Sequence, residues 1–208
     1  IDGIRVQRYR YAPRSWETLA YAGTMAEQVS GSLRGKLALL GMLAGGRLAV
    51  RRSVKTFAPD VVHAHWWFPS GLLVAGTSRT TPLVTTMHGS DVRLARRSSR
   101  APALLRRVVA SSAAVTVVST WLAKEARAMA PNLEASIEPM PVDVALFTPG
   151  GTRSAARLLF VGRLNAQKGA RVLIEALAAS ATGASLDVVG EGPDRSALAE
   201  RAATLGIA

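Results

Sequence analysis

The stretch "LLFVGRLNAQKGARVLIEAL" at residues 158–177 decides how the rest of the chain is interpreted. Its first four residues are apolar and predict a buried strand, and Gly162 lets the backbone turn sharply where that strand ends. A helix rich in alanine and leucine is expected over 168–179. Two fixed cations, Arg163 and Lys168, therefore lie at the start of a helix, where free N–H groups and the helix dipole favour anions. The pattern is equally consistent with a diphosphate-binding loop and with a solvated loop that carries two surface cations.

Strands and helices alternate along the whole chain. Strands are predicted over 4–11, 60–65, 82–88, 114–119, 135–140, 158–161 and 185–190. Helices are predicted over 15–30, 33–57, 101–111, 121–130, 168–179 and 194–205, with another from Ser70 and with Ser119 or Thr120 capping the one at 121–130. Such alternation builds a parallel sheet with helices on both faces, and the nearly continuous apolar strands fit burial on both sides. Glycines 41, 45 and 46 are expected to break or bend the helix over 33–57.

The charge balance of the chain is strongly basic. It has 208 residues, 26 basic against 14 acidic, and a net charge of +12. Such an excess suits nucleic acid, an anionic membrane or an anionic small substrate. However, only four of the basic residues are lysines, alanine is abundant and asparagine occurs twice, which is typical of a GC-rich coding sequence. We therefore give the charge little weight as a guide to function.

The chain has no cysteine, which excludes a disulfide framework and thiolate metal sites and fits a reducing compartment. The longest uncharged apolar run, 37–46, is too short to span a bilayer, which takes about 20 residues. The basic and apolar stretch over 33–55 could lie on an anionic membrane, but a buried helix with a charged end is the favoured interpretation.

A Pro-, Gly- and Ser-rich stretch at 139–157 predicts a linker between two domains, 1–148 and 149–208. The first domain lacks an opening strand and glycine loop. The second has only two predicted strands, too few for an independent parallel sheet. We therefore expect this chain to be the central part of a longer two-domain protein, with both domains incomplete.

Several polar residues follow predicted strands, where ligands bind in open α/β sheets. His63 and His65 share one strand face, and His88 and Asp91 follow the next strand. Three histidines and an aspartate suggest a metal site, but hydrogen bonding to substrate or backbone is the favoured interpretation, and no metal is expected.

Aromatic and glycine-rich segments also follow strands. Trp66 and Trp67 either pack in the core or form a stacking wall for a sugar or lipid acceptor. Gly190, Glu191 and Gly192 form either a second anion or nucleotide contact or a tight turn before a helix that begins near a proline.

Taken together, six segments in this order resemble the retaining glycosyltransferases of family 4: 59–71, 85–91, 114–125, 140–149, 158–177 and 186–198. The resemblance implies an α/β protein of the GT-B type, with two Rossmann-like domains that contain parallel sheets. Residues 1–148 would be the acceptor-side domain, and 149–208 would begin the nucleotide-sugar-binding domain.

The resemblance also implies roles for individual residues. It makes His88, Arg163 and Lys168 catalytic and places Gly162, Arg163 and Lys168 on the donor diphosphate. It places Gly190, Glu191 and Gly192 near the nucleotide, and we take His65, Trp66, Trp67 and Asp91 as acceptor-side candidates. The family's paired glutamates, seven residues apart, are absent from this sequence, so we expect the chain alone to be incomplete for catalysis.

The implied reaction moves a sugar from a nucleotide donor, such as a UDP-, GDP- or ADP-sugar, with retention and without a metal or other cofactor. The acceptor would be a carbohydrate, a lipid-linked or a small molecule in cell-envelope or polysaccharide biosynthesis. We expect a cytoplasmic protein, leave open a peripheral contact with the cytoplasmic membrane, and expect no nucleic acid. The alternatives are a sugar-nucleotide epimerase of the same fold and a non-catalytic basic module that binds anionic surfaces or nucleic acid.

Overall fold

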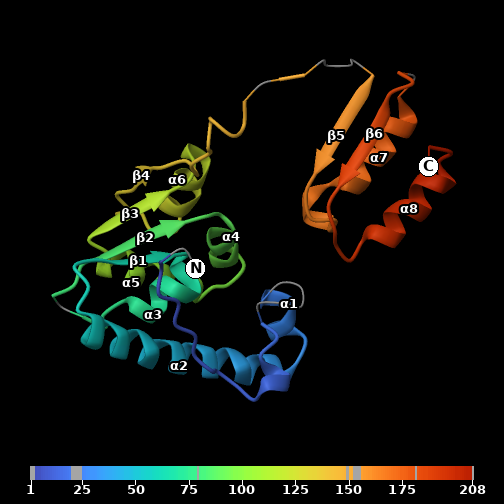
Figure 1. Ribbon diagram of the computed structural model, residues 1–208. Helices are drawn as coiled ribbons and strands as arrows, with labels where there is room; N and C mark the ends of the chain where they lie inside the picture. The colour runs from blue at the N-terminus through green and yellow to red at the C-terminus, as the bar shows by residue number, and fades with distance from the viewer. Residues whose placement is uncertain are drawn as a thin grey trace. The chain divides into compact units, whose positions relative to one another are not determined.

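The computed structural model describes residues 3–19, 25–78, 80–148, 150–151, 156–180 and 182–207. The chain divides into two compact units, Ile1–Pro141 and Val142–Ala208, and each is described here by itself (Figure 1). Residues 149 and 152–155 of the predicted linker lie outside the described part.

Unit 1 contains a four-stranded sheet in which every pair of neighbouring strands is parallel. Its order is β1-β2-β3-β4, with bounds Val62–His65, Leu83–Met87, Ala114–Val117 and Ser136–Ile137. The four strands predicted in this region are confirmed. All four carboxyl ends therefore lie at the same edge of the sheet, as a ligand-binding edge requires.

The helices of unit 1 form one layer over a face of this sheet and a separate small core beside it. They are α1 (Met25–Ser30), α2 (Leu33–Phe57), α3 (Leu72–Val74), α4 (Ser90–Arg96), α5 (Ala101–Ser111) and α6 (Thr120–Arg127), with short turns η1 (Arg14–Trp16) and η2 (Trp67–Gly71). The core of this layer contains Met87, Val117, Leu105, Val108 and Leu122. Ser119 caps α6 as predicted, since its hydroxyl accepts a hydrogen bond from the Leu122 N–H at 3.2 Å.

The opposite face of the sheet is less covered than the sequence suggested. Along β1, Ala64 is buried, whereas His63 and His65 on the other face are exposed. The expected burial on both faces is therefore found on one face only for this strand, because the described helices pack against the side of Ala64.

Two expectations for the N-terminal region were wrong. Residues 4–11 do not form a strand; they run along α2, with the Tyr9 hydroxyl donating to the Met42 carbonyl at 3.2 Å. Residues 17–19 are not helical, although a helix was predicted over 15–30, and residues 20–24 of that prediction lie outside the described part.

Helix α2 is one uninterrupted helix of 25 residues and is not broken at its glycines (Figure 1). The glycines instead allow close packing: a Cβ atom at Gly41 would lie 2.1 Å from the Tyr11 carbonyl oxygen.

No described helix is both long and apolar enough to cross a membrane.

Unit 2 has two parallel strands, β5 (Arg157–Val161) and β6 (Ser185–Val189), and the helices α7 (Ala170–Ala179) and α8 (Arg195–Thr204). Its small core contains Leu164, Ala170, Ile174 and Leu198. The predicted strands and helices are confirmed. Helix α7 begins two residues later than expected because Ala166–Lys168 form a 3-10 turn (η3) and Gly169 follows in the left-handed region, at φ +74°.

Candidate active site

Two loops of unit 2 lie side by side at the carboxyl ends of its strands. The loop after β5 is joined to the loop after β6 by backbone hydrogen bonds from Gly162 N–H to the Val189 carbonyl (3.0 Å) and from Leu164 N–H to the Glu191 carbonyl (2.9 Å). The sequence had singled out these segments separately. The structure brings them together into one surface.

Glycine is required where these loops touch. A Cβ atom at Gly190 would lie 1.9 Å from the Gly162 carbonyl oxygen, and one at Gly192 would lie 2.2 Å from the Leu164 carbonyl oxygen. Gly190 also has φ +150°, which side chains rarely adopt. These two glycines therefore hold the loops in contact.

The two cations of this loop pair are available to a ligand. Arg163 and Lys168 are exposed, and neither side chain makes a hydrogen bond or ion pair with another described residue. Helix α7 starts after Gly169 without a side-chain cap, so its first N–H groups also have no such partner. The arrangement suits an anion that carries several oxygen atoms.

Two further residues add polar groups to the same loops. The Asn165 amide oxygen is buried and has no hydrogen-bond partner among the described residues. Glu191 is exposed and pairs with Arg195, one turn further along. The sequence interpretation missed Arg195, although its position four residues after an acidic residue at a helix start was a visible signal.

In unit 1, the strand-end histidines form one cluster. His65 Nδ1 and His88 Nε2 are 2.8 Å apart, and the two rings are stacked with centroids 5.1 Å apart. Trp66 lies beside His88 at 5.5 Å between ring centroids, and its side chain is 43% exposed. These three rings thus combine hydrogen-bonding nitrogens with an aromatic face, the combination that binds sugars and other polar ligands.

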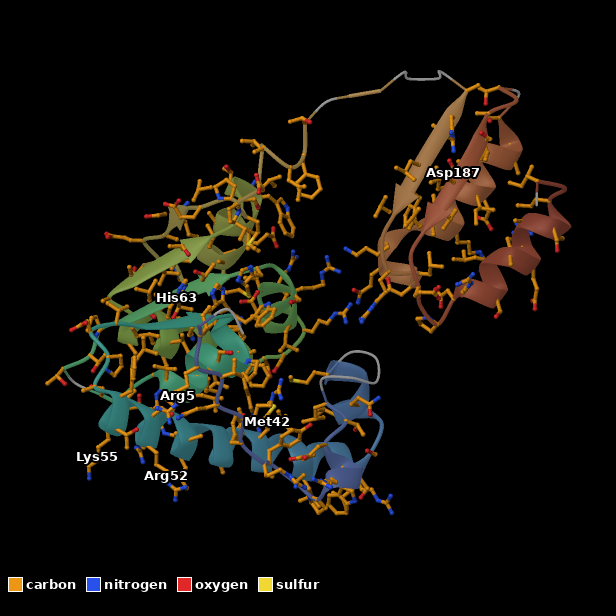
Figure 2. All side chains as sticks on the ribbon, in the orientation of Figure 1. Arg5, Met42, Arg52, Lys55, His63 and Asp187 are labelled. Carbon is orange, nitrogen blue, oxygen red and sulfur yellow. The ribbon has the colours of Figure 1, made fainter. Side chains whose placement is uncertain are left out.

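His63, the third histidine of this cluster, lies on β1 (Figure 2), and its ring centroid is 4.3 Å from that of His65. Its Nε2 lies 2.7 Å from the Thr86 hydroxyl, which lies 2.6 Å from the Thr116 hydroxyl on the next strand. The side of the His63 ring that lies against the sheet is partly desolvated, which lowers the pKa of His63, and the nearby His65 and His88 lower it further. The sequence interpretation missed both threonines, because only the strand register reveals them as neighbours.

Trp67 and Asp91 are placed differently from the other acceptor-side candidates. Both are buried, at 1% and 3% exposure. The Asp91 carboxylate accepts hydrogen bonds from the N–H groups of Trp67 (3.0 Å), His88 (3.2 Å) and Gly89 (2.9 Å). The indole N–H of Trp67 donates to the Asp91 carbonyl at 2.7 Å. This pair joins the ends of β1 and β2 and presents no accessible surface to an acceptor.

The side chains of the metal hypothesis lie in the described part of the chain. No three His, Asp or Glu side chains there are grouped so that they could hold one ion. The Asp91 carboxylate, the one acidic group of that hypothesis, accepts hydrogen bonds from three backbone N–H groups.

Two α/β units with parallel strands, each with polar side chains at the carboxyl ends of its strands, fit a fragment of a protein with the GT-B fold. The chain belongs to Glycosyltransferase Family 4, because the model of this family matches residues 9–146, about two thirds of its length.

Individual relatives agree with this assignment. The chain is 32% identical over 158 residues to a protein of Bacillus subtilis (strain 168) named as a teichuronic acid biosynthesis glycosyltransferase, TuaC. That match covers 69% of this chain and 40% of TuaC. The solved apo form of the lipopolysaccharide outer core galactosyltransferase WaaB shares the fold, with a TM-score of 0.59 at 20% identity over 83% of this chain and 48% of that one. The chain therefore spans less than half the length of both relatives.

Proposed function

We propose that this protein is a retaining glycosyltransferase that moves a sugar from a nucleoside-diphosphate sugar to an acceptor without a metal ion. The observation that carries the proposal is the loop pair of unit 2. There, Arg163 and Lys168 have no partner among the residues that the structure describes, and they lie beside an uncapped helix start. Family membership supports the reaction class.

The proposed chemistry explains why two cations are needed. When the bond between the sugar and the diphosphate breaks, negative charge grows on the departing diphosphate, and the sugar becomes oxocarbenium-like. Arg163, Lys168 and the N–H groups of α7 place positive charge at the loop pair, where it stabilises the negative charge that grows on the diphosphate. Removing one such group typically lowers the rate by about 10²–10³-fold.

For His88 we propose a contact with the transferring sugar. Its Nε2 is directed at His65, so the contact is made by its remaining ring atoms or after exchange of that hydrogen bond. We propose His65 and Trp66 as acceptor-side residues, because both are exposed beside His88. Trp67 and Asp91 then act indirectly, by fixing the backbone on which these residues lie.

The acceptor that we propose is a carbohydrate or lipid-linked intermediate of the cell envelope, handled on the cytoplasmic side. Support comes from the names of the relatives, which refer to teichuronic acid biosynthesis for TuaC and to the lipopolysaccharide outer core for WaaB. The donor base and sugar are left to experiment.

The test is a transfer assay on the protein in its full natural length. A panel of UDP-, GDP- and ADP-sugars is supplied with envelope extracts as acceptor and a chelator present, and the release of nucleoside diphosphate is followed. We expect release with one donor, an unchanged anomeric configuration of the product by NMR, and a loss of about 10²–10³-fold in Arg163→Gln but not in Arg171→Gln. Release that requires an added metal would contradict the metal-free reaction, and no release with any donor would contradict the transferase itself.

A further inference from the structure

Helix α2 has two faces of opposite character. Gly35, Ala38, Met42 and Gly46 follow one another at three- or four-residue intervals and are buried. They form the side of α2 that packs against the rest of unit 1. Gly35 and Gly46, which lower the intrinsic helix propensity, thus lie on this inner side. The outer side carries residues of another kind.

The outer side carries a continuous stripe at the same spacing. Its members lie on one helix face and are all exposed: Leu33, Leu37, Leu40, Ala44, Leu48, Arg51 and Lys55. The leucines are 72%, 46%, 63% and 48% exposed. A row of four exposed leucines on one helix is unusual for a surface that faces water alone, and it contradicts the expectation that this stretch is a buried helix.

The charge of α2 has a single sign. It contains six basic residues and no acidic one. Arg47 is engaged within unit 1, because its guanidinium donates to the Ala75 carbonyl at 3.0 Å and to neighbouring carbonyls. Two further cations, Arg34 and Lys36, are exposed in the first turn of α2. Arg51, Arg52 and Lys55 are exposed at the end of the leucine stripe, and Figure 2 shows Arg52 and Lys55 projecting from α2 on the side away from the sheet.

From these observations we infer that the outer face of α2 is a docking surface for a bilayer that contains anionic lipids. Leucines enter the boundary between headgroups and acyl chains when a helix lies in the plane of the interface, and arginines and lysines bind the anionic headgroups around it. The charge decides between this partner and an uncharged apolar one, because the exposed stripe ends in cations and α2 itself contains no acidic residue. The inference does not depend on the reaction proposed above.

The test is sedimentation of the full-length protein with vesicles of phosphatidylcholine, with and without phosphatidylglycerol, in the absence of donor and acceptor. We expect binding to the anionic vesicles that weakens as salt is raised. Leu37→Ser with Leu40→Ser should lower the partition coefficient at least about tenfold, since both side chains are exposed and the fold does not need them.

A charge variant with a matched control separates this surface from the general basicity of the chain. The variant replaces three cations of α2 by glutamine: Arg51→Gln, Arg52→Gln and Lys55→Gln. The control removes the same charge elsewhere on unit 1, from three exposed residues: Arg93→Gln, Arg97→Gln and Arg100→Gln. We expect the first set to weaken binding at least about tenfold and the second to leave it within about twofold.

Three outcomes would overturn the inference. The first is no binding to anionic vesicles, and the second is an equal loss of binding in the α2 and control variants. The third is a dimer in sedimentation equilibrium that dissociates in the Leu37→Ser, Leu40→Ser variant, which would mean that a second copy of the chain covers this face. These experiments measure no sugar transfer, so none of the three results bears on the proposed reaction, which is tested by the transfer assay.

Discussion

At the scale of single residues, one carboxylate organises the strand-end site of unit 1. Asp91 is buried, and its two oxygens accept hydrogen bonds from three backbone N–H groups on two loops. One of those N–H groups belongs to His88. The position of the proposed sugar-binding histidine therefore depends on a residue that the sequence suggested as an acceptor contact.

Replacing Asp91 by asparagine tests this role. The amide keeps the shape but has only one acceptor oxygen, so at least one buried N–H loses its partner. We expect unit 1 to lose about 1–3 kcal/mol of unfolding free energy, measured by urea denaturation with tryptophan fluorescence. The exposed Asp60→Asn serves as control and should change the unfolding free energy by less than about 0.5 kcal/mol. Equal effects of the two variants would contradict the role of Asp91.

The histidine cluster makes a prediction about pH. The pKa of His63 is lowered in the folded protein, mainly by burial, so the unfolded chain binds the proton more readily. The stabilisation by neutral His63 is therefore present above the unfolded pKa of about 6.5 and is lost as the pH falls from there through the folded pKa. We expect the denaturation midpoint of unit 1 to fall with the pH in this range, and to fall less in His63→Asn. Identical pH profiles for the wild-type protein and His63→Asn would show that the pKa of His63 is not lowered in the folded state.

At the scale of helices and strands, local sequence patterns predicted most of the elements. The predictions failed where contacts between residues far apart in the sequence decide the structure. The strands from Val62 onward follow from apolar runs, and the cap at Ser119 follows from its position before a helix. The segment at residues 4–11 has the alternation of a strand, but its backbone lies against α2 instead of a neighbouring strand. The hydroxyl pair Thr86–Thr116 depends on register between strands, which no local pattern contains.

Glycines 41 and 45 of α2 offer a matched comparison of packing with helix propensity. Alanine at Gly45 would make only ordinary contacts, the nearest at 3.4 Å, and should stabilise the helix by up to about 1 kcal/mol. Alanine at Gly41 would lie 2.1 Å from the Tyr11 carbonyl and should cost about 1–3 kcal/mol despite the better propensity. Thermal unfolding of both variants checks this, and a stabilised Gly41→Ala would mean that residues near Tyr11 do not pack against α2.

The loop contact of unit 2 is tested at Gly190. A methyl group there would meet the Gly162 carbonyl at 1.9 Å and would also have to adopt a strained backbone angle. We expect Gly190→Ala to destabilise unit 2 by about 2 kcal/mol, read out by hydrogen exchange of the Gly162 and Leu164 amides. Gly150→Ala, with nothing within 4 Å, should leave these amides unchanged. Unchanged protection in Gly190→Ala would contradict the contact between the loops.

At the scale of the whole molecule, the proposed function assigns a different part to each of the two units. Unit 1 contributes a polar and aromatic strand edge with a separate amphipathic face on α2. Unit 2 contributes a loop pair with two cations that pair with no other side chain in the described part of the chain. The sequence predicted that both cations lie between a strand and a helix, because strand, loop and helix follow one another within about 20 residues. It could not predict that the loops at Gly162 and Gly190 touch, because a strand, a helix and a loop separate them.

The most direct test of the account is calorimetric titration of the full-length protein with UDP, GDP and ADP. The account predicts that one of these diphosphates binds, and that Arg163→Gln and Lys168→Gln each raise its Kd at least about tenfold, or about 1.4 kcal/mol. Arg171→Gln removes the same charge from the exposed side of α7 and should leave the Kd within about twofold. If none of the three diphosphates binds, or if all three variants behave alike, the loop pair of unit 2 is not a diphosphate site.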